Sequence, residues 1–261
     1  DGVFDHMVVI GYDEDGNHLS EQSDHEAYLR KSGFKPIQKT NLSSEDIKKL
    51  ESLTPKVSVA DMKKANQQVP GVVRYFVKRF TDKKTGKEVI ALQRLVLPVS
   101  MRAGNDSTIA KQKEAYIKQH MGQVDAFLYG GHARYGTGPD IDHIDSSAGN
   151  IRVANGYSRK PKAGTIDRVK YGDRYQLMLF DGCTTTHYLS GLNSRQMQKN
   201  RDLILTTTET PWGTTGFNMK TTIDGIMQQR SFNGIMGDLN DKTGAGTYTA
   251  RYLKNNRYVP W

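Results

Sequence analysis

The sequence has very little cysteine and no long apolar run. Cys183 is the only cysteine in 261 residues, so no intramolecular disulfide can form and a disulfide-stapled scaffold is excluded. No apolar stretch approaches the roughly 18 residues of a transmembrane helix, and no segment has the pattern of a signal peptide. We therefore expect no membrane span. Hydrophobic residues make up 36% of the chain, which is enough for a packed core and unlike a disordered composition.

Acidic residues are unevenly distributed. Residues 1–26 contain eight Asp or Glu and no Lys or Arg, although the whole chain carries a net charge of +9. A basic body can attract nucleic acid, anionic lipid or an acidic partner. Aromatic residues do not interleave with the basic ones, however, and no nucleic-acid motif is present. We interpret the basic excess as a solubilising surface and expect no nucleic-acid partner. The acidic segment could also cover the basic body as an inhibitory segment.

Acidic residues lie near other possible metal ligands at two places in the sequence. Neither place has the residue spacing of a metal site. Asp13, Asp15 and Asn17 alternate as in a calcium loop, but the glycine and the distal glutamate of an EF-hand are not where that loop needs them. His143 lies between Asp142 and Asp145 without a second histidine or a cysteine at ligand spacing. The sequence therefore predicts no metal site and no cofactor.

The order of periodic segments predicts the fold class. From Leu95 onward the expected order is strand, helix, strand, long loop, strand, helix, strand, helix, which is typical of a three-layer α/β/α sandwich with a mostly parallel sheet. The expected strands are 7–10, 72–80, 88–97, 124–129, 177–180 and 202–208, and the expected helices are 43–54, 59–67, 105–122, 188–200, 217–236 and 248–253. We expect residues 1–88 to form an N-terminal extension with an acidic segment, short helices and a hairpin, and residues 89–261 to form the main domain.

The segment around Cys183 is the most informative part of the chain. A short apolar run at residues 177–180 predicts a buried strand. Gly182 permits a tight turn, and the threonines at 184–186 can cap a helix. Cys183 is thus expected at the carboxyl end of a strand and near a helix N-terminus, where ligands bind and thiolates are favoured. A small buried core cysteine is the alternative, and this segment alone leaves both open.

His132 follows another short apolar strand and two glycines, Gly130 and Gly131. If this strand and the strand before Cys183 are neighbours, both side chains emerge at the same edge of the sheet. An imidazole can then act as the base that a thiol nucleophile needs. The glycines let the backbone turn sharply and let a substrate approach, and nearby N–H groups could hold an oxyanion. The alternative for His132 is a surface loop histidine.

These two segments, YGGHARYG and MLFDGCTTTHYL, resemble the histidine and cysteine segments of the caspase-like cysteine peptidases, a superfamily that includes caspases, legumains, clostripain and gingipains. The resemblance covers roughly residues 90–240 and implies that 89–261 is a catalytic domain. It implies His132 as general acid/base, Cys183 as nucleophile, and the backbone N–H groups of Ala133 and Cys183 as oxyanion donors. The family usually has Gly after the histidine and a residue such as Ala before the cysteine. Here Ala133 and Gly182 stand at those positions.

The resemblance also implies a substrate path. Gly131 and Gly182 would border it, and the strand and loop that contain Thr208 and Trp212 would carry the peptide. Asp140 and Asp142, with Asp145, could line a pocket for Arg or Lys or form a solvated loop. The basic segment 159–174 could be a self-cleaved loop or plain surface.

Two hypotheses follow for the function. The first is a cysteine endopeptidase that cuts peptides or proteins after a basic residue. The second is a caspase-like scaffold that serves as a non-catalytic binding or regulatory module. A papain-like arrangement is disfavoured, because there the cysteine precedes its histidine, and the only later histidine here is His187, four residues on. The sequence leaves the oligomeric state open.

Overall fold

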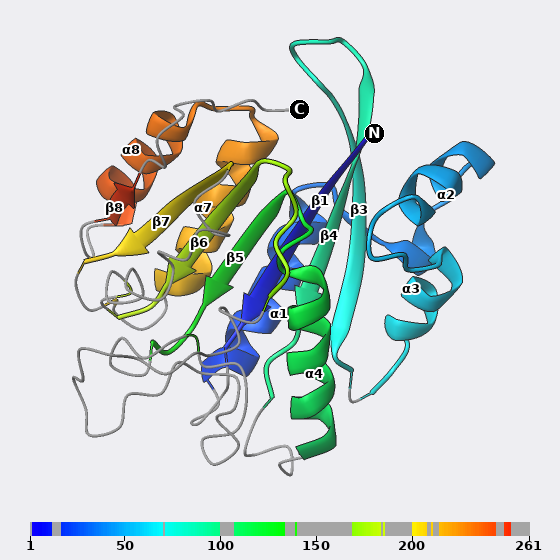
Figure 1. Ribbon diagram of the computed structural model, residues 1–261, viewed down its shortest axis with the longest axis horizontal. Coiled ribbons are helices and arrows are strands. Elements are labelled where there is room, and N and C mark those ends of the chain that lie inside the picture. Colours follow the sequence, from blue (N-terminus) through cyan, green and yellow to red (C-terminus); the bar gives the residue numbers. More distant parts are fainter. Residues whose placement is uncertain are drawn as a thin grey trace.

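Figure 1 shows a computed structural model of the protein, built around one eight-stranded mixed sheet. The structure describes residues 2–11, 17–69, 71–99, 107–133, 139, 169–183, 185, 200–207, 210, 214–243 and 248–251. The strands are β1 Val3–Ile10, β2 Lys35–Pro36, β3 Val73–Thr81, β4 Glu88–Val96, β5 Ala126–Gly130, β6 Gln176–Asp181, β7 Arg201–Thr206 and β8 Tyr248–Arg251. Their order across the sheet is β2-β3-β4-β1-β5-β6-β7-β8.

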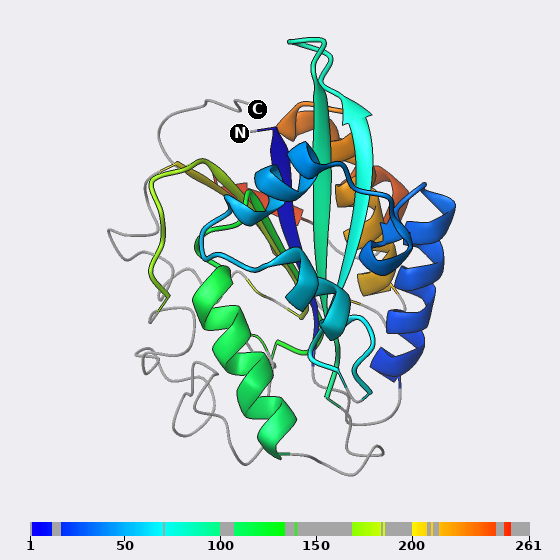
Figure 2. The ribbon, with the colours of Figure 1, turned by 90° about the vertical axis from the view of Figure 1, so that its right-hand side faces the viewer.

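The five central strands, β4, β1, β5, β6 and β7, are parallel to one another, and the antiparallel pairings lie toward the two edges. The hairpin of β3 and β4 extends beyond the rest of the sheet at the top of Figures 1 and 2. Strands that are buried on both faces need continuous apolar runs, and β5 and β6 have them. The prediction of an α/β protein with a mostly parallel sheet is confirmed.

Helices cover both faces of this sheet. They are α1 Asn17–Lys31, the 3-10 turn η1 Ile37–Lys39, α2 Ser44–Glu51, α3 Val59–Ala65, α4 Ser107–His120, α7 Thr214–Met227 and α8 Phe232–Thr243. One apolar core joins the sheet to α2, α3 and α4, and a second joins it to α1, α7 and α8. Figure 2 shows α4 on one side of the strands and α1 on the other. The arrangement is a three-layer sandwich.

Alternate residues of β1 serve the two cores. Met7 and Val9 pack into the core with α4, whereas Val8 and Ile10 pack into the core with α1. Polar side chains interrupt both cores. On the α4 side, Arg94 of β4 donates to both carboxylate oxygens of Asp5, at 2.7 and 2.8 Å. Burial acts to lower the pKa of Arg94, but the Asp5 carboxylate outweighs it and holds that pKa well above its ordinary value.

The expected division into an N-terminal extension and a separate main domain is corrected by the position of β1. This strand lies in the middle of the sheet and pairs with β4 on one side and β5 on the other. The expected boundary at residues 88/89 also falls at the start of β4, inside the hairpin. Strand pairing is non-local, so the sequence order of segments did not reveal it. Residues 3–10 are therefore an integral part of the fold.

Several local predictions can be compared with the structure. The expected helix start is confirmed: Ser43 and Asp46 form a capping box at the N-terminus of α2. The helix expected over 217–236 is two helices, because the chain turns between α7 and α8, where Gln229 has a left-handed φ of 56°. The short helix expected at 248–253 is wrong, since residues 248–251 form β8 against β7. The helix expected over 188–200 lies outside the described residues, apart from Asn200.

Candidate active site

The two candidate catalytic residues follow neighbouring parallel strands. β5 pairs with β6 so that Gly130 lies opposite Asp181, the last residue of each strand. His132 and Cys183 each come two residues after this pair, at the same edge of the sheet. We call the chain segments that follow β1, β5 and β6, namely Gly11, Gly131–Ala133 and Gly182–Cys183, the carboxyl rim. The structure therefore places the chain segments that contain His132 and Cys183 next to each other at one edge of the sheet.

Backbone contacts hold the segments of the carboxyl rim against one another. The N–H of Gly131 donates to the carbonyl of Asp181 at 3.1 Å, and the N–H of Gly11 donates to the carbonyl of Gly130 at 2.8 Å. A Cβ added to Gly182 would lie 2.5 Å from the carbonyl oxygen of Gly131 and 3.3 Å from the Ala133 side chain. The segment with His132 and the segment with Cys183 are thus in direct contact, and only glycine fits at position 182 without a shift.

Cys183 is half-buried and borders the apolar core on the α4 side. Hydrogen bonds of two threonines, Thr185 and Thr206, hold the turn that contains it. The Thr206 hydroxyl bonds to the Gly182 carbonyl, and the Thr185 hydroxyl lies 2.8 Å from the Phe180 carbonyl and 2.9 Å from the Thr206 hydroxyl. These bonds fix the turn on either side of Cys183, and the residue as a whole is neither fully buried nor fully exposed.

Two backbone N–H groups are available on the carboxyl rim. Within the part of the chain that the structure describes, the N–H groups of Ala133 and Cys183 donate to no acceptor. Ala133 is buried, and a buried N–H without an acceptor is rare in folded proteins. Both groups lie where the segments with His132 and Cys183 meet. A backbone N–H group without a protein acceptor can donate to a bound anion.

Sequence reasoning missed two residues of helix α1: His18, which contacts the His132 ring, and Glu21, which bonds to His18. The imidazole rings of His18 and His132 meet edge to face, with centroids 5.4 Å apart and planes at 77°. The Nδ1 of His18 lies 2.5 Å from a carboxylate oxygen of Glu21, and both side chains are buried. Glu21 had been counted only as part of an acidic segment. The spacing of His18 and Glu21 by three residues was the available signal, because it places both on one helix face.

A buried amine lies close to the same edge. Lys113 of α4 is fully buried, and its Nζ donates to the carbonyl of Ile10, the last residue of β1, at 2.8 Å. Asp181 at the end of β6 accepts a bond of 2.8 Å from the side-chain amide of Asn218 on α7. The edge of the sheet therefore combines imidazole, thiol, amine and carboxylate groups within a few residues of three strand ends.

No protein-family model, curated protein or solved structure matches this chain. What the protein does must therefore be inferred from its own residues.

The remaining predicted site residues lie outside the described residues. These are Asp140, Asp142, Thr208 and Trp212, together with Asp145, His143, His187 and the basic segment up to residue 168. In the described ranges, no group of three or more His, Cys, Asp or Glu side chains is arranged to hold a metal ion. None of the described helices has both the length and the apolar composition that a membrane crossing needs.

A second pair of histidines lies deeper between the sheet and α1. Gln93 of β4 bridges them: its carbonyl oxygen lies 2.7 Å from Nε2 of His6, and its amide nitrogen lies 2.7 Å from Nε2 of His25. Burial lowers the pKa of His6 to about 4 and the pKa of His25 to about 3, and for His25 the Lys220 ammonium acts in the same direction. Both imidazoles are neutral at pH 7. They join α1 to the sheet through Gln93.

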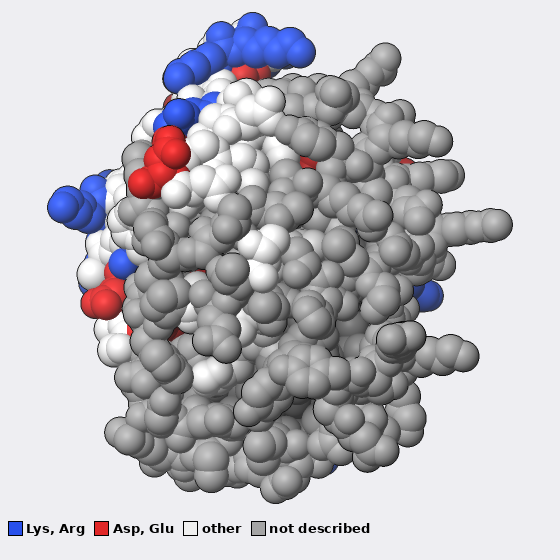
Figure 3. All heavy atoms as spheres, turned by 90° about the vertical axis from the view of Figure 1, so that its left-hand side faces the viewer, with Lys and Arg blue, Asp and Glu red and all other residues white. Residues whose placement is uncertain are grey.

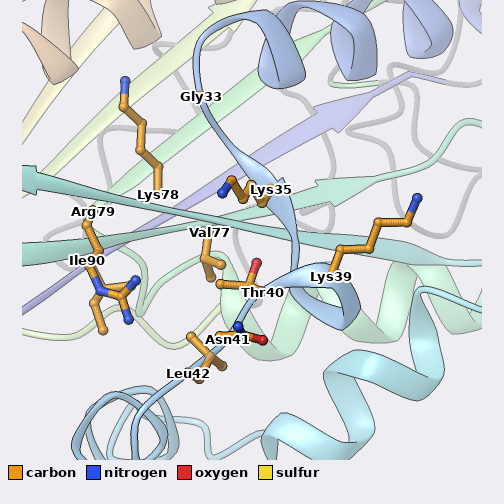
Figure 4. Close-up of a pocket in the computed structure, with 10 residues that line it drawn as sticks. All are labelled: Gly33, Lys35, Lys39, Thr40, Asn41, Leu42, Val77, Lys78, Arg79 and Ile90. Carbon is orange, nitrogen blue, oxygen red and sulfur yellow. The ribbon is translucent and has the colours of Figure 1, made fainter.

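A basic hollow of about 410 Å³ lies away from the carboxyl rim, between η1 and the β3–β4 hairpin (Figure 4). Its basic side chains do not converge: Lys39 and Lys78 point away from the hollow, and Arg79 is paired with Asp46 and Glu88. In Figure 3, described basic side chains lie next to acidic ones along the left edge of the view, so they do not form a purely basic patch there. Neither feature forms an anion site.

Proposed function

We propose that the protein is a cysteine endopeptidase of the caspase-like type, in which Cys183 is the nucleophile and His132 the general acid/base. The observation that carries this proposal is the pairing of β5 with β6, with Gly130 opposite Asp181. A histidine after one parallel strand and a cysteine after its neighbour is the arrangement that these peptidases use. The half-buried state of Cys183 and the contact between Gly182 and Gly131 support it.

The proposed reaction follows from the chemistry of these groups. His132 takes the proton of the Cys183 thiol, and the thiolate attacks the carbonyl carbon of the scissile peptide bond. The oxyanion is bound by the backbone N–H groups of Ala133 and Cys183. The C–N bond then breaks, His132 gives its proton to the leaving amine, and a thioester remains on Cys183. Water, deprotonated by His132, hydrolyses the thioester and restores the free thiol.

Substrate selection forms the second part of the proposal. Asp140 and Asp142 would supply the negative charge that binds an Arg or Lys side chain before the cut, and Thr208 and Trp212 would border the peptide. Carboxylates pair with guanidinium and ammonium groups in this way. The basic segment 159–174 would offer such residues for self-cleavage.

A peptide library tests the proposal. Wild type, Cys183→Ala and His132→Gln are compared with Lys84→Ala, a change at the exposed tip of the β3–β4 hairpin. We expect wild type and Lys84→Ala to cleave after Arg or Lys, and the two catalytic variants to lose about 10²-fold or more in kcat/KM. Folding of each variant is checked by circular dichroism.

Equal turnover by Cys183→Ala would refute the role of Cys183. If the wild type cleaves no peptide and iodoacetamide does not label Cys183 near pH 6, the chain is a non-catalytic binding module instead. Rapid labelling near neutral pH marks a thiolate, because the thiol form does not react.

A further inference from the structure

We infer that His18 and Glu21 of helix α1 are positioning residues for His132 and that they favour its protonated form. The inference rests on the proposed function, because it concerns the imidazole that accepts the Cys183 proton. It assigns a role at the carboxyl rim to the amino-terminal part of the chain. No sequence motif had suggested a role for either residue.

The geometry links three buried or half-buried side chains in a row. Glu21 bonds to Nδ1 of His18 at 2.5 Å, and the His18 ring meets the His132 ring at 77° with centroids 5.4 Å apart. The backbone of His132 is also held, because the Tyr129 hydroxyl donates to its carbonyl at 2.6 Å. An edge-to-face contact restricts the plane of a ring, so His18 limits the orientations open to the His132 imidazole.

Glu21 sets the position of the proton on His18 and adds a negative charge to this row of side chains. A carboxylate that bonds one nitrogen of an imidazole places the proton on that nitrogen and sets the tautomer. The carboxylate also provides a negative charge that is buried, where screening by water is weak. When Cys183 gives up its proton, His132 becomes an imidazolium, and this charge stabilises it. The thiolate–imidazolium pair is then more populated than it would be without Glu21.

Two other ionisable groups lie at the same edge of the sheet. Lys113 of α4 bonds to Ile10 at the end of β1, and Asp181 ends β6 beside Cys183. The Lys113 ammonium opposes an imidazolium on His132, whereas the Asp181 carboxylate favours one. Both groups are the same in all variants below, so their effect cancels in each comparison.

The experiment measures how fast iodoacetamide alkylates Cys183 as a function of pH. Glu21→Gln keeps the size of the side chain and removes its charge. Glu26→Gln is the matched control, because it makes the same change on the same helix, where Glu26 pairs with the half-exposed Arg30. The key quantity is the rate at pH 6 divided by the rate at about pH 10, where the thiol ionises without help from His132.

We expect this ratio to fall on the order of tenfold in Glu21→Gln, the size of effect that Coulomb's law gives for one nearby charge at an effective dielectric constant near 20. Glu26→Gln should leave it unchanged. In a His132→Gln background, Glu21→Gln should have no further effect, because the group that it acts on is gone. His18→Phe keeps an aromatic ring against His132 and leaves the Glu21 charge in place, so it should lower the ratio less than Glu21→Gln does.

An unchanged ratio in Glu21→Gln would overturn the inference, and so would an equal fall in the His132→Gln background. A purely structural role of Glu21 would change the rates at both pH values together and leave the ratio as it is. Failure of the proposed function has a different signature. In that case the wild type cleaves no peptide, while the alkylation ratio still reports whether Glu21 acts on His132.

Discussion

Acidification should unfold this protein through the two histidines that Gln93 joins. His6 lies against the rings of Phe4 and Phe34, and both His6 and His25 are fully buried. Because each is neutral in the folded chain, with pKa values lowered by burial to about 4 for His6 and about 3 for His25, protonation is unfavourable as long as the fold persists.

The sign and size of the effect follow from proton linkage. In the unfolded chain the pKa of a histidine is about 6.5, so below that pH the unfolded chain binds protons that the folded chain does not. The stability contribution is complete above about pH 6.5 and is lost as the pH falls toward the lowered values. At about 1.4 kcal/mol per pH unit, each histidine lowers the free energy of unfolding by about 2 kcal/mol between pH 7 and pH 5.

The assay is urea unfolding of wild type and His25→Gln at pH 7 and at pH 5, followed by circular dichroism. His25→Gln removes one of the two titrating groups, so its loss of unfolding free energy between the two pH values should be about 2 kcal/mol smaller than that of the wild type. Ser23→Ala, at an exposed position of the same helix, should behave as wild type.

Other buried groups titrate in the same range but cancel in this comparison. Burial, with the Arg94 charge acting in the same direction, lowers the pKa of His120 to about 3, and burial raises the pKa of Asp125 to about 6. Both are present in all three proteins. If wild type and His25→Gln lose the same free energy on acidification, the account of His25 as a neutral buried imidazole is refuted.

Two substitutions test the packing of the rim and of the core. Gly182→Ala places a Cβ 2.5 Å from the Gly131 carbonyl, so we expect a loss of about 1–3 kcal/mol in urea unfolding, with a fall in any peptidase activity. Gly216→Ala in α7 is the control, because a Cβ at this position meets nothing within 4 Å. It should raise the free energy of unfolding by about 0.5–1 kcal/mol. Equal effects of the two changes would contradict the close contact at position 182. Arg94→Met leaves Asp5 charged and unpaired in the core, which should cost about 3–5 kcal/mol, and Asp5→Asn in the same protein should recover part of that loss. No recovery in the double variant would argue against the pair.

The sequence allowed six of the strands, and the places of His132 and Cys183 after two of them, to be predicted because these depend on local patterns. Short apolar runs next to glycines gave the strands before His132 and Cys183, and the pairing of β5 with β6 then brings both residues to one edge. The capping box at Ser43 was equally readable, since it needs only residues three apart. Each of these features lies within a few consecutive residues.

Helix α1 could not be predicted because its inward positions are polar. His18, Glu21 and His25 occupy buried positions where an amphipathic pattern would need apolar residues, so no period of 3.6 was visible. The partners that make these side chains acceptable, Gln93 and His132, are far away in the sequence. The contribution of α1 to the candidate site was missed for the same reason.

The place of β1 in the sheet has a consequence for biosynthesis. During synthesis β1 can find its neighbours only after β4 and β5 have been made, because Met7 lies opposite Arg94 on one side and Phe127 on the other. Until then its apolar residues stay without partners, and such unpaired edges invite association with other chains. β1 therefore stays unpaired on the β5 side until the chain has been made as far as Gly130, the last residue of β5.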